Sequence, residues 1–324
     1  MANPPRGGET DMLENGQVRE LSRRRHPIGY FRLARPAFVA RAERNDSKAR
    51  LRKACGLLLL AVAAALAPEA RAQADYRNLD PGRPVAIEDA QPIEFRAFEI
   101  QFSLPRFTRE RGGDWELGFE PEFKVGFARD WQFGISSEFV TARGEDNTVS
   151  SFRDTQLHLL YNFNQESRQW PAIALRPELT IRTGALGSEH EHGGLKVIVS
   201  KTLHRNRVHL NGSYTVGPTE APGRGGELVN RFLYGAAYER TFPLHFVVLL
   251  ADVYARKPID NSPTEVVFEA GTRVQVNPQW VVDAGVSSGV LRDSVGPDFG
   301  FTFGVSYSFS FRSLFPTGAP QRKE

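Results

Sequence analysis

FGFTFGVSYSFSF, residues 299–311, is the stretch that decides the fold of this chain. Its odd-numbered residues are Phe, Val or Tyr, and its even-numbered residues are Gly, Thr or Ser. Alternation with period two places these two sets on opposite faces of a β-strand. A face of aromatic rings opposite a face of small polar groups is typical of a barrel strand with lipid on one side and a polar lumen on the other.

The same alternation recurs along the chain upstream of this strand. In residues 155–163, for example, Leu157 and Leu159 alternate with Gln156 and His158. No segment after residue 75 reaches the roughly 18 consecutive apolar residues of a membrane-spanning helix. The pattern therefore predicts an all-β fold, a transmembrane antiparallel up-and-down β-barrel of about twelve strands. The predicted strands are 95–105, 115–127, 131–142, 152–163, 172–183, 193–203, 207–217, 230–241, 244–256, 264–276, 280–290 and 299–311.

The connections between these segments alternate in length. Those after even-numbered segments are short, whereas those after odd-numbered segments are mostly longer and polar. Outer-membrane barrels have short periplasmic turns and long outer loops, so both chain ends are predicted to be periplasmic. Trp131, Trp170 and Trp280 lie beside short turns, where an interfacial girdle of aromatic residues is expected.

An export signal precedes the predicted barrel. The apolar run GLLLLAVAAALA, residues 56–67, follows a basic stretch and precedes small-x-small sites ending at Ala72 and Ala74. The run is shorter than the roughly 20 residues of a spanning helix and has the features of a cleavable signal peptide. The predicted organisation is an N-terminal extension (1–47) that is disordered or translated from a start codon called too early, a signal peptide (48–74), a periplasmic segment (75–94), the barrel (95–311) and a C-terminal tail (312–324).

Removal of the presequence changes the charge of the chain. The full sequence has 41 basic and 38 acidic residues, but residues 1–72 hold 14 of the basic and 7 of the acidic ones. The remaining chain carries 27 basic and 31 acidic residues, so no basic surface indicates nucleic-acid binding. The single cysteine, Cys55, lies in the presequence, which excludes a disulfide framework in the mature chain. No cofactor is expected.

Charged residues on the polar faces of the strands are predicted to line the lumen. Charges of both signs can either pair into a network that fills the barrel or line a wet pore, and twelve strands are intermediate between these cases. The sequence leaves both the filled barrel and the wet pore as hypotheses. The predicted lumen residues are Glu99, Glu120, Glu122, Lys124, Glu138, Arg176, Glu178, Arg182, Arg207, Arg231, Glu239, Asp252, Glu269, Arg273 and Asp283.

Two motifs contain residue types that can carry chemistry. His209 and Ser213 lie four residues apart in one strand, roughly 13 Å at about 3.3 Å per residue, which is too far for the hydrogen bond of a catalytic pair. The run 189–192, Glu-His-Glu-His, has metal-ligand residue types but reads as a solvated loop. We therefore predict no catalytic residue and no metal ligand, and an outer-membrane lipid hydrolase remains a less favoured alternative.

The C-terminal half resembles a known family. The segments YERTFPLHFVVLLADVYAR (238–256), FEAGTRVQVNPQWVVDAGVSSG (268–289) and FGFTFGVSYSFSF (299–311) are similar to the outer-membrane proteins of the meta-pathway of phenol degradation family, often called transporters. The resemblance covers roughly residues 93–311 and brings no catalytic motif. It implies an outer-membrane barrel that admits aromatic or other hydrophobic compounds.

The function expected from the sequence is a narrow channel for uptake of small hydrophobic or aromatic molecules. The alternative is a structural or ligand-binding outer-membrane barrel without flux. The expected partners are outer-membrane lipid, lipopolysaccharide, the barrel assembly machinery and a small-molecule solute. Residues 75–94 include Pro81, Pro84 and Pro92, too many prolines for a strand. We expect this segment to sit at the periplasmic mouth as a partial plug.

Overall fold

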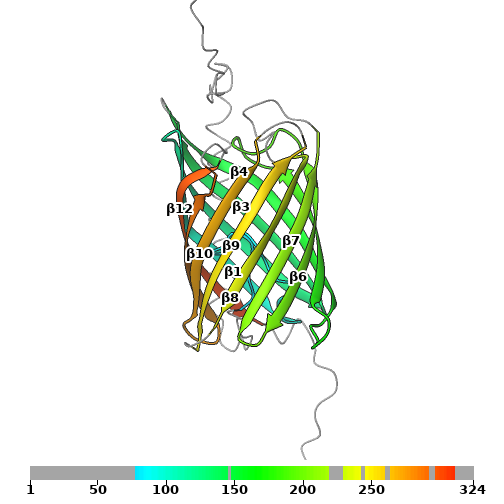
Figure 1. Ribbon diagram of the computed structural model, residues 1–324. Helices are drawn as coiled ribbons and strands as arrows, with labels where there is room; N and C mark the ends of the chain where they lie inside the picture. The colour runs from blue at the N-terminus through cyan, green and yellow to red at the C-terminus, as the bar shows by residue number, and fades with distance from the viewer. Residues whose placement is uncertain are drawn as a thin grey trace, which may run out of the picture. The chain divides into compact units, whose positions relative to one another are not determined.

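The computed structural model describes residues 77–144, 147–218, 229–241, 245–259, 263–291 and 296–310. The predicted extension, signal peptide and C-terminal tail lie outside these residues. The predicted barrel is confirmed: twelve antiparallel strands pair in sequence order, and β1 closes the sheet against β12 (Figure 1). The strands are β1 (Phe98–Glu110), β2 (Trp115–Ala128), β3 (Trp131–Arg143), β4 (Thr148–Asn164), β5 (Ala172–Arg182), β6 (His192–Leu203), β7 (Asn206–Val216), β8 (Arg231–Arg240), β9 (Val247–Pro258), β10 (Glu265–Gln275), β11 (Trp280–Gly289) and β12 (Pro297–Phe309).

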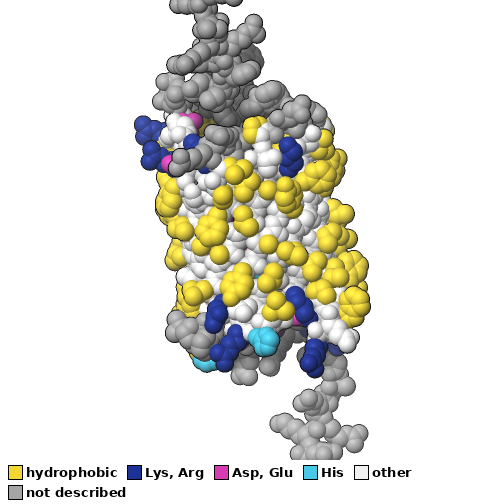
Figure 2. Space-filling model, in the orientation of Figure 1, with side chains coloured by type: hydrophobic (Ala, Val, Ile, Leu, Met, Phe, Trp, Pro, Cys, Tyr) yellow, Lys and Arg dark blue, Asp and Glu magenta, His cyan; other side chains and the backbone are white. Residues whose placement is uncertain are grey.

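The outer face of the barrel is apolar. Phe299, Phe301 and Phe303 of β12 are 38–46 % exposed, and hydrophobic side chains cover the middle of the barrel wall in Figure 2. Lys and Arg gather towards the two ends of the barrel in the same view. Exposure of an apolar belt of this extent to water is unfavourable, so this belt is the surface that contacts lipid. No helix among the described residues is long and apolar enough to cross a membrane.

The barrel has two ends that differ in their connections. At the end that holds the start of β1 and the end of β12, here called the turn end, three of the five connections have two to four residues. At the opposite end, here called the loop end, connections 183–191 and 217–230 are the longest. Trp131 and Trp280 begin strands at the turn end, and Trp170 lies in a turn there.

Two loop-end connections are shorter than the sequence pattern predicts. We expected loops over 106–114 and 143–151, but β1 continues to Glu110 and β4 begins at Thr148, which leaves four residues in each connection. The predicted strand 95–105 ended at Pro105, but the observed strand does not. The strand passes it through a register shift between Leu104 and Phe107, because a proline without an N–H group is tolerated where the ladder is interrupted.

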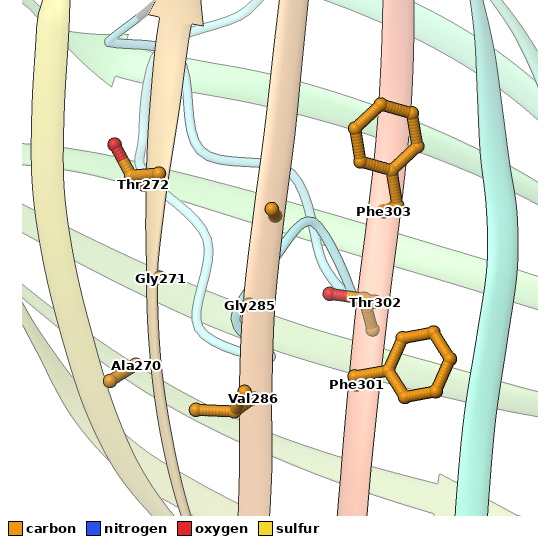
Figure 3. Close-up of a pocket in the computed structure, with 9 residues that line it drawn as sticks. Ala270, Gly271, Thr272, Gly285, Val286, Phe301, Thr302 and Phe303 are labelled. Atoms are coloured by element: carbon orange, nitrogen blue, oxygen red, sulfur yellow. The ribbon is translucent and has the colours of Figure 1, made fainter.

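An apolar hollow of about 440 Å³ lies on the outer face of β10, β11 and β12. Phe301, Phe303 and Val286 flank it, and Gly271 and Gly285 form its thin floor (Figure 3). The ladder between β10 and β11 is continuous from Val267–Gly289 to Gln275–Val281. The hollow is therefore a dent in the wall that a lipid acyl chain can fill, and not a lateral opening.

Candidate functional site

Residues 77–97 enter the barrel and form a segment that we call the plug. We expected this part of the chain at the mouth of the barrel, but it reaches deeper and packs against the inner wall. Leu79 and Val85 contact Val248 and Leu250 of β9. Further along, Ile87 packs against Ala237, Tyr254 and Val267. These contacts place most of the plug in the turn-end half of the lumen, and Ile87 reaches past the middle of β9 and β10.

The tip of the plug is a tight turn. Gly82 has a φ of +78°, and its N–H donates to the Val85 carbonyl at 2.7 Å. Pro84 then packs against Gly285 and Gly271, where an added Cβ would come within 2.5 and 2.6 Å of the proline ring. A side chain at either wall position would therefore displace the tip from this position, because its Cβ would occupy the space of Pro84.

Wall side chains bind the plug backbone. Asp252 Oδ2 accepts hydrogen bonds from the N–H groups of Ala86 and Ile87, both at 2.9 Å. Ser200 Oγ accepts the N–H of Ala90 at 2.9 Å, and Gln132 Oε1 accepts that of residue 93 at 2.9 Å. An irregular segment inside a barrel needs such partners because its buried peptide groups are otherwise unsatisfied. The wall thus replaces water along the plug.

Three plug carboxylates form ion pairs with cations of the wall. Asp80 pairs with Lys124, and Arg273 Nη2 lies 3.9 Å from its other oxygen. Glu88 lies between two cations, 2.6 Å from Arg176 and 2.7 Å from Lys196. Asp89 pairs with Arg207 at 3.1 Å, and the same guanidinium reaches Glu239 at 3.1 Å. The plug is therefore complementary to the wall in charge.

The surroundings shift the pKa values of these three carboxyls differently. Burial acts to raise the pKa of Asp80, but Lys124 and Arg273 outweigh it and lower the value to about 2. Burial opposes the cations at Glu88 too, where the pKa is lowered by Arg176 and Lys196. At Asp89 burial prevails over Arg207 and raises the pKa to about 6. Asp80 and Glu88 are thus firm anionic contacts near neutral pH, and Asp89 is the weakest of the three.

The loop-end half of the lumen differs from the half that holds the plug. Arg153 pairs there with Glu116 at 2.5 Å and with Glu138 at 3.2 Å, and Arg256 pairs with Glu265 at 2.9 Å. These side chains are 17–39 % exposed, whereas those of the plug ion pairs are 1–13 % exposed. The loop-end part of the lumen is therefore more exposed to solvent than the part around the plug, and we call it the wet cup.

The structure places the predicted lumen residues in three groups. Eight are buried: Glu99, Lys124, Arg176, Glu239, Asp252, Glu269, Arg273 and Asp283. Six are half-buried: Glu120, Glu122, Glu138, Glu178, Arg207 and Arg231. Arg182 is exposed and donates to the Glu189 carbonyl at 3.2 Å, near the loop end.

Strict alternation missed two lumen cations. Arg106 follows the register shift at Pro105, and its guanidinium lies 3.8 Å from the position of an added Cβ on Gly82 of the plug. Arg153 lies within the shift opposite residues 137–139 of β3. A bulge adds one residue to a strand, so beyond it the odd- and even-numbered residues exchange faces. Pro105 was a signal for the first shift, whereas nothing comparable marks the second.

His209 contacts Ser200 and not Ser213, the residue considered with it in the sequence analysis. Its Nδ1 lies 2.8 Å from Ser200 Oγ on the neighbouring strand, and its Nε2 lies 3.7 Å from Glu239 Oε2. Ser200 also binds the N–H of Ala90, and all three wall residues are fully buried beneath the plug. Ser200, His209 and Glu239 therefore form part of the wall surface on which the plug packs. As for the run 189–192, no three His, Cys, Asp or Glu side chains lie close enough for a metal ion in the described part of the chain.

Solved structures share the architecture of this barrel. An outer-membrane channel from Pseudomonas putida F1 superposes with a TM-score of 0.53 at 12 % identity, covering 72 % of this chain and 100 % of that one. The KdgM porin, solved in complex with disordered oligogalacturonate, is less similar, with a TM-score of 0.46, 14 % identity and coverage of 65 % and 99 %. Outer-membrane phospholipase A from Escherichia coli has a TM-score of 0.38, 11 % identity and coverage of 64 % and 92 %.

Sequence comparisons give no match for this chain. No protein-family model matches the chain, and no curated protein sequence matches it. At 12 % identity, the likeness to the Pseudomonas putida channel shows the fold, which is that of an outer-membrane β-barrel.

Proposed function

We propose that this protein is an outer-membrane channel for small solutes, closed by its own N-terminal plug and opened when the plug moves. The observation that carries the proposal is the division of the lumen into a wet cup and a half filled by residues 77–97. In this arrangement the turn end faces the periplasm and the cup faces the cell exterior. Lipid and lipopolysaccharide surround the apolar belt, and the barrel assembly machinery inserts the chain.

The chemistry of the plug contact supports movement. Glu88, Asp89 and Asp80 are held by cations, and Asp252 and Ser200 bind peptide N–H groups. These polar wall groups regain water when the plug leaves, which offsets part of the cost of exposing the apolar wall beneath Leu79, Val85 and Ile87. Polar contacts of this kind are typical of interfaces that form and separate.

The solutes that we propose are small and hydrophobic or aromatic. A wall with charges of both signs does not select strongly between anions and cations, and the resemblance to the phenol-degradation family indicates aromatic compounds. A lipopolysaccharide leaflet is a barrier to such solutes. The second candidate is a structural barrel without flux, which the filled turn-end half favours.

Solute uptake distinguishes these candidates. Vesicles with lipopolysaccharide in the outer leaflet and carrying the full chain should take up labelled phenol faster than empty vesicles, and sucrose no faster. Asp252→Ala should accelerate uptake, because it removes the acceptor of two plug N–H groups. Glu116→Ala, which removes a carboxylate of the wet cup, serves as the matched control. Uptake of phenol equal to that of empty vesicles for both variants would leave the structural barrel as the function.

A further inference from the structure

Glu88 occupies a site that the barrel wall builds for a carboxylate. Its two oxygens lie 2.6 Å from Arg176 Nη1 and 2.7 Å from Lys196 Nζ, and all three residues are buried. Asn211 holds the main chain beside it, accepting the Glu88 N–H at 3.0 Å and donating to the Glu88 carbonyl at 2.8 Å. Contacts to both oxygens and to the adjacent peptide groups fix the position of the carboxylate.

The wall needs an anion at this point. Arg176 of β5 and Lys196 of β6 are direct cross-strand partners. Like charges directly opposite each other in a sheet destabilise it. Among the ion pairs formed by the described residues, Glu88 is the carboxylate that lies within 4.0 Å of either cation. When the plug leaves, the two cations lose this contact and lie side by side on the lumen wall, with Glu178 and Glu122 as more distant carboxylates.

An apolar surface lies next to the cation pair on the same wall. Ala174 and Ile198 are also cross-strand partners, two residues further towards the turn end on β5 and β6. Together with Leu160 and Ala172 they form a buried cluster that receives Ala90 of the plug. Residues two apart on a strand share a face about 7 Å apart. Glu88 and Ala90 therefore present a carboxylate and a small apolar group to matching surfaces.

From this arrangement we propose that Arg176 and Lys196 form a binding site for small aromatic carboxylates, and that Glu88 is its resident internal ligand. The carboxylate of a solute such as benzoate binds between the two cations. Its ring lies on the surface of Ala174, Ile198 and Leu160 that Ala90 otherwise covers. A solute at this site excludes Glu88, so its binding releases the plug. The inference rests on the proposed channel function and names the solute class and the trigger for opening.

Equilibrium dialysis of labelled benzoate against the folded, detergent-solubilised full chain tests the site directly. Glu88→Ala removes the internal ligand, so it should bind benzoate about tenfold or more tightly than the unmodified chain. Adding Arg176→Gln or Lys196→Gln to Glu88→Ala should weaken binding about tenfold or more, because each removes one charged contact. Benzamide, which has the ring without the charge, should not compete, and acetate, which has the charge without the ring, should compete weakly.

Arg153→Gln combined with Glu88→Ala is the matched control, since Arg153 pairs with Glu116 and Glu138 in the wet cup. It should bind benzoate as tightly as Glu88→Ala alone. The gel mobility shift of folded barrels on heating verifies each variant, and either cation variant suffices if the other does not fold. Equal binding by the unmodified chain and Glu88→Ala, or equal losses with Arg153→Gln and Arg176→Gln, would overturn the inference.

Conductance separates this inference from the proposed function. Benzoate should raise the frequency of openings of the full chain in planar bilayers, and benzamide should not. Openings that occur without any response to benzoate would contradict the site and leave the channel intact. Benzoate binding in a chain that never conducts would support the site and contradict the channel.

Discussion

Deletion of residues 77–90 is expected to change the barrel from a closed state into a steadily conducting one. This segment supplies every plug carboxylate that pairs with the wall, as well as Pro84 at the tip. The barrel itself is held by the ladders between its strands, which the deletion leaves in place. Without the plug, water enters the turn-end half and hydrates the lysines, arginines and carboxylates that line it.

Planar bilayer recording measures this effect. The full chain should show low or intermittent current, and the deletion variant a constant current proportional to voltage. The gel mobility shift on heating should be the same for both proteins, which verifies that the barrel has folded. A folded deletion variant with the current of the full chain would show that residues 77–90 do not block the lumen.

A charge on the outer face is expected to cost far more than a charge in the cup. Phe303 lies in the middle of β12 and is 42 % exposed on the lipid side. Phe303→Arg should lower the free energy of unfolding in lipid vesicles by about 2–4 kcal/mol, because a guanidinium near the bilayer midplane loses its water. Gln156→Arg is the control, since Gln156 is exposed on the inner face of β4. Chemical denaturation in vesicles measures both, and equal losses would contradict the assignment of the two faces.

The sequence predicts the barrel well because a period of two is a local property. The alternation in residues 299–311 is set by neighbours in the chain, and the observed β12 covers Pro297–Phe309. The same logic placed eleven other strands within a few residues of their observed bounds, except at the loop-end limits of β1 and β4. Those limits depend on bulges. A bulge changes which side chains face the lumen, but the amino-acid composition of the segment does not reveal it.

The plug could be predicted only in part. Three prolines indicated that residues 75–94 do not form a strand, but nothing local specifies how far the segment enters the lumen. Its depth is set by partners distant in sequence, such as Glu88 with Arg176 and Ala86 with Asp252. The sequence pattern predicted which faces of the strands carry Arg176 and Asp252. It could not show that these side chains bind a segment of the same chain.

A reversible tether tests most directly whether the plug moves to open the barrel. In a Pro84→Cys, Gly285→Cys variant with Cys55 replaced by Ser, the two new thiols face each other across the plug tip. An added Cβ at Gly285 lies 2.5 Å from that of Pro84, and a disulfide needs about 3.5–4.5 Å, so the tip shifts by about 1–2 Å to form the bond. After oxidation we expect no current in planar bilayers, and after reduction we expect discrete openings to return. Openings of equal size and frequency with the tether closed and cut would contradict a movable plug.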